Sequence, residues 1–555
     1  MKPKNLLYLA SLVAFLSLAL LIFSGTPVAA QKGAASAAIK STSQIEIPPA
    51  RVRTWQEMEA DAAKEAAGPP PPLRVKKFRP TRGEAAYQAL KAQATQTSTL
   101  QAPAAPSTES AAPLAPTTLT NPINFEGVDS VTAGGWRPPD TEGAVGPNHF
   151  VEITNSHIDI YQKAAPNTKV SGVPLSSFFG YTAQGLFDPR VVYDSGSQRW
   201  IMTADAFAQS ATIQYFFIAV SQSSDPTGAF YIYRVNVSDG HGVTGGVQWD
   251  FPMVGFDQNA VIFTANFFTA AGAFIDARMF TVAKSSLYSG PSGTLTPTLI
   301  TGLAGTLAAP VVLDTNANTY LVAADDASFS QAWIYTMTNS AANPPTLSGP
   351  VAIPVTAFAY PPNAVQPGTA ATLDSSDCRF VNVSTQIGNS LFQVHTINSG
   401  GYARPRFYEF DTVNKTVIQS GTFNRSSTSY DFNASIAANR TKDVFVTWSA
   451  TDPVNSVNAE ARFSGRLHTD TSGVIPSPGY LLYGSATYYN FTGSGVQRWG
   501  DYSAVSIDPA DATGLTAWII NERILTTNTW GNRIGSIKLP ARLSLQGAYL
   551  LLLLD

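Results

Sequence analysis

"RWGDYSAVSIDP", from Arg498 to Pro509, places polar residues and a Trp-Gly pair in front of an alternating apolar run. Alternation of apolar and polar residues over this length is typical of a half-buried β-strand, and the Asp-Pro pair marks the turn that ends it. The arrangement recurs, since a short apolar strand, a polar turn and a second apolar strand follow one another in six further segments. These segments begin at Asp140, Asp188, Asp250, Ala309, Asp377 and Asp431.

Further strands follow these pairs, for example "YFFIAVS" (Tyr215–Ser221) and "AFYIYRVNV" (Ala229–Val237). Four strands in each of seven units, spaced by roughly 48 to 70 residues, indicate a β-propeller. We therefore expect an all-β protein with a single seven-bladed β-propeller over residues 121–540. Its closure should pair Pro122–Gly127 with the last blade near Asn532–Leu539. Six or eight blades, or a tandem of β-sandwiches, remain alternatives.

The composition agrees with an all-β fold and excludes several classes of protein. Charged residues make up 13% of the 555 residues, and the chain contains 41 glycines and 38 prolines, as many short strands joined by turns require. A net charge of −3 gives no basis for binding nucleic acid. Cys378 is the only cysteine, which excludes an intramolecular disulfide and zinc or iron–sulfur sites built on cysteines.

The N-terminus reads as an export signal. Lys2 and Lys4 precede an apolar run from Leu6 to Phe23, and small residues then lead to a cleavage site between Ala30 and Gln31. We expect residues 1–30 to be a signal peptide and the protein to be secreted or held at the cell surface. A membrane becomes a partner only if the apolar run is not cleaved.

Residues 31–120 are rich in Ala, Pro, Ser and Thr, which predicts a disordered spacer. Transient helices are expected over Thr54–Ala67 and Gly83–Thr95. A basic cluster in this segment is either solvated or in contact with an acidic surface; its members are Arg74, Lys76, Lys77, Arg79 and Arg82. After the propeller comes an apolar tail, residues 541–555, for which the sequence suggests no partner.

The first strand of each propeller blade lines the central channel, so the polar residues that lead these strands should converge at one end of it. Such a concave site could hold an acidic sugar or a peptide carboxylate, because arginine binds carboxylates in a bidentate manner. In the alternative interpretation, the leading acids accept backbone N–H bonds and fix the blade spacing. The candidate ligand-binding residues are Arg190, Asp250, Arg379, Asp431, Arg498, Trp499 and Asp501.

The stretches "PPDTEGAVGPNHFVEITN", "FDPRVVYDSGSQRWIMTA" and "WGNRIGSIKLP", together with the opening stretch, carry a family resemblance. The chain resembles large secreted bacterial β-propeller proteins that are described as uncharacterised or sialidase-like. The resemblance implies export and a propeller fold. The sialidase comparison further implies Tyr502 as a nucleophile activated by Glu522, with Asp140 and Asp188 as acids, although Pro189 precedes Arg190 where sialidases have Arg-Ile-Pro.

These observations predict a monomeric, non-catalytic binding or adhesion module that recognises glycan or protein at the cell surface. The alternative is a carbohydrate-active enzyme, a sialidase-like glycoside hydrolase with its site at the central channel. No cofactor is expected. For calcium, "LDTNANT" places Asp314, Asn316 and Asn318 at alternate positions, as either the start of a calcium loop or an Asx-rich hairpin turn.

Overall fold

A computed structural model describes residues 41–68, 74–100, 119–238, 247–291 and 293–541. The expected cleavage site at Ala30 and Gln31 and nearly all of the C-terminal tail lie outside these residues. Within them, strands dominate, which confirms the all-β prediction, and no helix is long and apolar enough to cross a membrane.

In the first half of the propeller, strands that follow one another in the chain pair antiparallel. One set contains β4 (Glu142–Val145), β5 (His149–Thr154), β6 (His157–Gln162) and β7 (Lys169–Pro174). The next contains β8 (Leu186–Asp194), β9 (Arg199–Ala206), β10 (Tyr215–Ser221) and β11 (Phe230–Asn236). The third contains β12 (Val247–Phe256), β13 (Ala260–Thr269), β14 (Phe274–Ala283) and β15 (Thr298–Leu303).

The second half repeats this order. A short β16 (Pro310–Val312) precedes β17 (Asn318–Ala324), β18 (Gln331–Thr338) and β19 (Thr346–Pro354). Then come β22 (Ser384–Ile387), β23 (Ser390–Ser399), β24 (Tyr402–Asp411) and β25 (Thr416–Thr422), followed by β26 (Tyr430–Ala438), β27 (Val444–Asp452), β28 (Val457–Arg466) and β29 (Tyr480–Gly484). The last set contains β31 (Ala504–Ile507), β32 (Thr516–Thr526) and β33 (Thr529–Lys538), and a separate small sheet contains β20 (Ala364–Val365), β21 (Thr372–Leu373) and β30 (Val496–Gln497).

The core lies between neighbouring sets of strands. Ile153 of β5 and Met202 of β9 share one buried cluster, and Ile218 of β10 and Phe263 of β13 share another. Because sheets cover both faces of an inner strand, β13 is buried almost throughout and its sequence "AVIFTANFFT" is largely apolar. Parallel pairing of β12, β16 and β22 merges strands into one ten-stranded sheet, so the number of blades stays a prediction.

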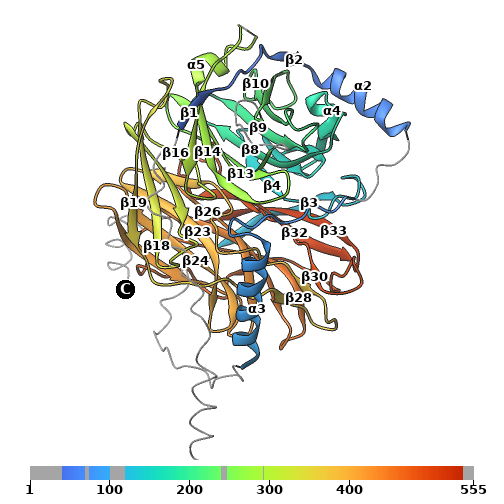
Figure 1. Cartoon of the computed structure of the whole chain (residues 1–555). Coiled ribbons are helices and arrows are strands. Elements are labelled where there is room, and N and C mark those ends of the chain that lie inside the picture. Colours follow the sequence, from blue (N-terminus) through green and yellow to red (C-terminus); the bar gives the residue numbers. More distant parts are fainter. Residues whose placement is uncertain (1–40, 69–73, 101–118, 239–246, 292, 542–555) are drawn as a thin grey trace, which may run out of the picture. The chain divides into compact units, whose positions relative to one another are not determined.

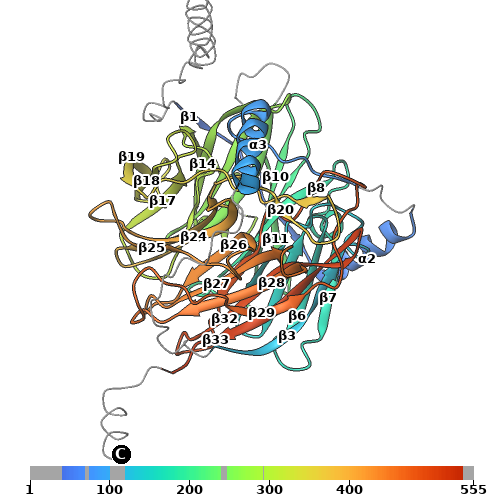
Figure 2. The same cartoon turned by 90° about the horizontal axis from the view of Figure 1, so that it is seen from below.

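The ring closes as the sequence predicted. β3 (Thr120–Asp129) pairs antiparallel with β33, with Ile123 opposite Ser536 and Phe125 opposite Ile534. Figure 2 shows β3 beside β33 at this closure. The first strand of the propeller thus covers an edge of the last set that would otherwise expose unpaired backbone groups.

Two parts of the segment predicted as a disordered spacer instead pack against the propeller, which corrects that prediction (Figure 1). β1 (Ser41–Gln44) pairs with β15, and β2 (Arg51–Arg53) pairs with β11. The helices α2 (Trp55–Ala66) and α3 (Glu84–Leu100) form close to the two predicted ranges. These residues adopt a defined structure because of specific contacts with the propeller, which the composition of the segment does not reveal.

The first of these contacts is at the start of α2. A capping box joins Thr54 and Glu57, and the buried Trp55 packs its ring 5.9 Å from Phe178. Phe178 lies in the short helix α4 (Leu175–Phe179), and the other short helix, α5 (Lys284–Leu287), follows β14.

Candidate functional site

Residues of β4, β8, β12, β26 and β31 line a central channel, and a basic segment of the chain lies against the polar strand starts at one end of it. We call residues 74–82 the strap. Val75 of the strap forms a parallel bridge with Arg137, where Lys76 N donates to Arg137 O over 2.9 Å and Arg137 N donates to Arg74 O over 2.9 Å. This pairing places the Lys76 side chain inside the site, whereas that of the neighbouring Lys77 is exposed.

The Lys76 ammonium is buried among aspartates from three strand starts. It forms a short ion pair with Asp188 and lies 3.3 Å from Asp250 Oδ1 and 3.9 Å from Asp140 Oδ2. Burial on its own lowers the pKa of this lysine, but the charges of Asp188, Asp250 and Asp140 outweigh it and raise the pKa above its usual value. Lys76 is therefore a buried cation that is held by several carboxylates.

Two of the predicted arginines hold the backbone of the strap. Arg498 Nε donates to Lys76 O over 3.1 Å, and Arg379 donates to Arg79 O over 3.2 Å. The Phe78 ring lies 4.6 Å from the Arg379 guanidinium and 5.6 Å from that of Arg498. The strap is thus recognised through both main-chain carbonyls and side chains.

The same guanidinium groups already bind carboxylates within the chain. Arg379 binds Asp377 through two hydrogen bonds of 2.8 and 2.7 Å, and Arg498 binds both Asp374 and Asp501. A carboxylate ligand would have to displace these partners, so the geometry does not favour the acidic sugar or peptide carboxylate that the sequence suggested.

The first residues of several inner strands have the same backbone irregularity, which turns their side chains toward the channel. β8, β12 and β26 each carry a β-bulge at the strand start, and Asp188, Phe251 and Asn433 there have φ values of 48°, 57° and 48°. A bulge leaves one residue outside the ladder and redirects its side chain. Polar groups of neighbouring strand starts can therefore meet at one place.

Asp140 and Asp188 also tie neighbouring strand starts together. Asp140 accepts hydrogen bonds from Asn155 Nδ2 at 2.7 Å and from Asp501 N at 3.0 Å, and Asp188 accepts one from Phe251 N at 2.9 Å. These are the bonds expected from the blade-spacing interpretation. The two acids hold the scaffold and face Lys76 at the same time.

Arg190 lies deeper in the channel, and its bonds are satisfied within the protein. It donates to Glu142 Oε2 at 2.9 Å, to Asn382 Oδ1 and Val381 O at 3.0 Å each, and to Pro252 O at 2.8 Å. Its guanidinium stacks 3.4 Å from the centre of the Tyr502 ring. Arg190 therefore ties strand starts to one another and uses four of its five N–H donors within the protein.

The residues that the sialidase comparison implied do not form its catalytic pair. The buried Tyr502 hydroxyl has no hydrogen-bond partner among the described residues, so it is not paired with Glu522. Glu522 Oε2 instead accepts a hydrogen bond of 2.7 Å from Gly500 N. A nucleophile and base in this mechanism need mutual hydrogen-bond reach, which this arrangement does not supply.

Two further predicted residues form hydrogen bonds within the propeller scaffold. Asp431 accepts hydrogen bonds from Trp448 Nε1 at 2.8 Å and Arg425 N at 2.9 Å, and burial raises the pKa of its carboxyl to about 6. Trp499 is buried and donates to Ser449 Oγ over 3.1 Å. Neither side chain is open to a ligand in this structure.

The segment with Asp314, Asn316 and Asn318 has the hydrogen bonds of Asx turns. Asn316 N donates to Asp314 Oδ1 over 3.1 Å, and Asn318 N donates to Asn316 Oδ1 over 3.0 Å. Asp314 Oδ2 further accepts from Gly388 N at 2.6 Å. The geometry favours the hairpin-turn interpretation over a calcium loop.

Sequence reasoning missed Asp205 and the place of Lys76. Asp205 lies near the end of β9, whose sequence is "RWIMTADA". An acidic residue in a largely apolar strand is unusual, and this signal could have identified Asp205 from the sequence. Both of its carboxylate oxygens are buried and have no hydrogen-bond partner within the part of the chain that the structure describes. Burial, together with the charges of Asp188 and Asp250, raises the pKa of Asp205 well above its usual value.

Strand topology and the channel-end site define the class of protein, an all-β propeller whose channel end is occupied by its own N-terminal strap. No protein-family model matches the sequence, and no curated protein matches it.

Solved structures that are similar to the chain include the following three. A protein of unknown function from Dyadobacter fermentans shares 10% identity at a TM-score of 0.34, over 63% of this chain and 94% of that one. An exo-β-1,3-galactanase from Phanerochaete chrysosporium shares 9% identity at a TM-score of 0.30, over 72% of this chain and 92% of that one. A sialidase from Trypanosoma rangeli shares 10% identity at a TM-score of 0.31, over 71% of this chain and 58% of that one. Similarities this weak carry no argument about activity.

Proposed function

We propose that this protein is a non-catalytic binding propeller at the cell surface whose channel end binds an extended peptide that carries a lysine side chain. The observation behind the proposal is the burial of the Lys76 ammonium against Asp188, Asp250 and Asp140. The surface location rests on the apolar N-terminal run and its small-residue site, which predict export.

The pattern of contacts fits a peptide better than a neutral sugar. Arg498 and Arg379 donate to main-chain carbonyls of the strap, and Arg137 O accepts from the Lys76 backbone amide. Binding sites for extended peptides combine main-chain hydrogen bonds, which supply affinity, with a side-chain pocket, which supplies specificity. A neutral sugar offers no ammonium for the aspartates.

The strap would compete with any external ligand for this site. It belongs to the same chain, so its effective concentration at the site is set by the connecting residues and is high, on the order of millimolar for a short flexible link. An external peptide then gains access when the strap is weakened, and the native protein would be a low-affinity binder until the strap leaves.

The test uses the full chain and a fluorescent synthetic peptide with the sequence Val75–Arg79. Lys76→Ala should increase peptide binding at least tenfold over the wild type, because the internal ammonium no longer fills the pocket. Lys77→Ala is the matched control, since the Lys77 side chain is exposed, and should bind like the wild type. Circular dichroism establishes that each variant is folded.

A second peptide, with norleucine in place of the Lys76 residue, tests the role of the ammonium. It should bind the Lys76→Ala protein at least tenfold more weakly than the lysine peptide. Equal binding of the two peptides, or no gain in the folded Lys76→Ala variant, would exclude the aspartate pocket as a lysine site.

A further inference from the structure

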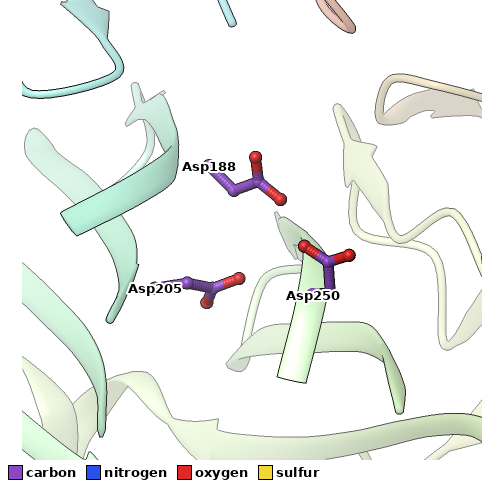
Figure 3. Close-up of side chains that lie close together, drawn as sticks. All are labelled: Asp188, Asp205 and Asp250. Carbon is purple, nitrogen blue, oxygen red and sulfur yellow. The ribbon is translucent and has the colours of Figure 1, made fainter. Parts of the chain in front are cut away.

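Three buried aspartates from three strands converge beside the strap. Asp188 of β8, Asp205 of β9 and Asp250 of β12 each offer a carboxylate oxygen, and these oxygens lie within 4.8 Å of one another. Figure 3 shows the three carboxylates around a common space. The cluster arises because β8 and β9 are paired neighbours and Asp250 lies at the bulge of the next inner strand.

The positive charges of the strap compensate this cluster only in part. Lys76 contacts Asp188 and Asp250, and Arg79 lies 3.4 Å from Asp250 Oδ2. Asp205 is 0% exposed, and among the described residues neither of its oxygens has a hydrogen-bond partner. A buried carboxylate without a partner has lost its hydration, which is unfavourable unless a proton or a cation binds to it.

We infer that Asp188, Asp205 and Asp250 form a binding site for a hard divalent cation such as Ca²⁺, which takes the place of the Lys76 ammonium. Hard cations prefer carboxylate oxygens, and Ca²⁺ completes its shell of six to eight ligands with carbonyl groups and water. One dication balances three carboxylates better than one ammonium does. This site goes beyond the proposed peptide binding.

Competition follows from the contacts that the two cations would share. The Lys76 ammonium contacts Asp188 and lies 3.3 Å from Asp250 Oδ1, so a metal ion bound to both carboxylates would repel the ammonium at close range and displace it. Binding of the metal and docking of the strap would then weaken each other by the same factor. Metal binding would thereby release the strap from the channel end.

The test is calorimetric titration of the chelator-treated full chain with CaCl₂, and with MgCl₂ for comparison. We expect one Ca²⁺ site in the wild type. Asp205→Asn should raise the Kd for Ca²⁺ at least tenfold, and Lys76→Met should lower it at least tenfold. Lys77→Met and Glu46→Gln, which change exposed charges, are the controls and should leave the Kd unchanged.

The opposite signs expected for Asp205→Asn and Lys76→Met separate a metal site from a general loss of structure. Absence of Ca²⁺ binding in both the wild type and the folded Lys76→Met variant would overturn the inference. An unchanged Kd in folded Asp205→Asn would also overturn it. The peptide assay is run in the presence of chelator, so its result does not depend on whether the metal site exists.

Discussion

At the scale of single residues, buried polar side chains stabilise the propeller by joining strand starts. Arg190 shows this most clearly, since its four bonds reach Glu142, Asn382, Val381 and Pro252. The planar guanidinium presents donors in a fixed fork, which a lysine cannot reproduce. A residue that resembles a ligand-binding arginine in the sequence is therefore part of the scaffold.

His395 provides a prediction at this scale. Its Nδ1 lies 2.7 Å from Cys378 O and its Nε2 lies 3.0 Å from the Tyr408 hydroxyl, so the neutral ring uses both nitrogens. Burial lowers the pKa of His395 from 6.5 to about 3. Below pH 6.5 the unfolded chain takes up a proton that the folded protein excludes, so its contribution to stability is lost as the pH falls.

His395 should contribute a loss of about 2 kcal/mol in the free energy of unfolding from pH 7 to pH 5, measured by urea titration as the difference in pH dependence between the wild type and His395→Gln. His395→Gln should be less stable at pH 7 and should lack this part of the pH dependence. His468→Gln, at an exposed position, should retain it. The same pH dependence in His395→Gln and the wild type would show that another group is responsible.

At the scale of elements, the two helices of the N-terminal segment are each held by a few anchoring side chains, whereas Ile45 and Ile47 before them belong to a core cluster of the propeller. Trp55 of α2 packs against Phe178, and its indole Nε1 donates to Pro226 O over 2.6 Å. Lys91 of α3 donates to Pro361 O at 2.8 Å, Ser375 Oγ at 3.0 Å and Ser376 O at 2.8 Å. Each helix should therefore detach without unfolding the propeller.

Trp55→Ala tests this independence. Loss of the anchor should speed tryptic cleavage after Lys64 at least tenfold, because α2 opens locally. The urea midpoint of the propeller should stay near the wild-type value. Gln56→Ala, an exposed position on the same helix, should leave the cleavage rate unchanged. A large fall in the urea midpoint of Trp55→Ala would mean that α2 and the propeller unfold as one unit.

At the scale of the whole propeller, pairing of β3 with β33 closes the ring. Phe125 of β3 lies partly buried at this closure, with its ring 5.2 Å from that of Tyr161 and 6.5 Å from that of Trp518. The contact with Trp518 joins Phe125, near the start of the propeller, to β32 in the last set of strands. Closure therefore depends on side-chain packing as well as on the strand ladder.

Phe125→Ala should lower the free energy of unfolding by about 2 kcal/mol, less than a fully buried phenylalanine because the ring is partly exposed. Urea unfolding measures the change, and hydrogen exchange of the β33 amides should become faster. Val131→Ala is the control, since Val131 is 79% exposed and should change stability by less than about 0.5 kcal/mol. Unchanged exchange in β33 would contradict a closing role for this contact.

The sequence predicted the repeat pattern, the all-β class and the closing strand, because the alternation of apolar and polar residues and the positions of turn residues are local properties of the chain. The Pro122–Gly127 pairing and the helices α2 and α3 followed from such local signals. The occupant of the channel could not be predicted, because the contact between Lys76 and Asp188 joins residues that are 112 positions apart. Spacing along the sequence does not specify which of several basic residues meets that acid. The roles of Arg190 and Asp205 depended in the same way on which partners the folded chain brought within hydrogen-bond distance, since burial makes a satisfied charge stabilising and an unpartnered one costly.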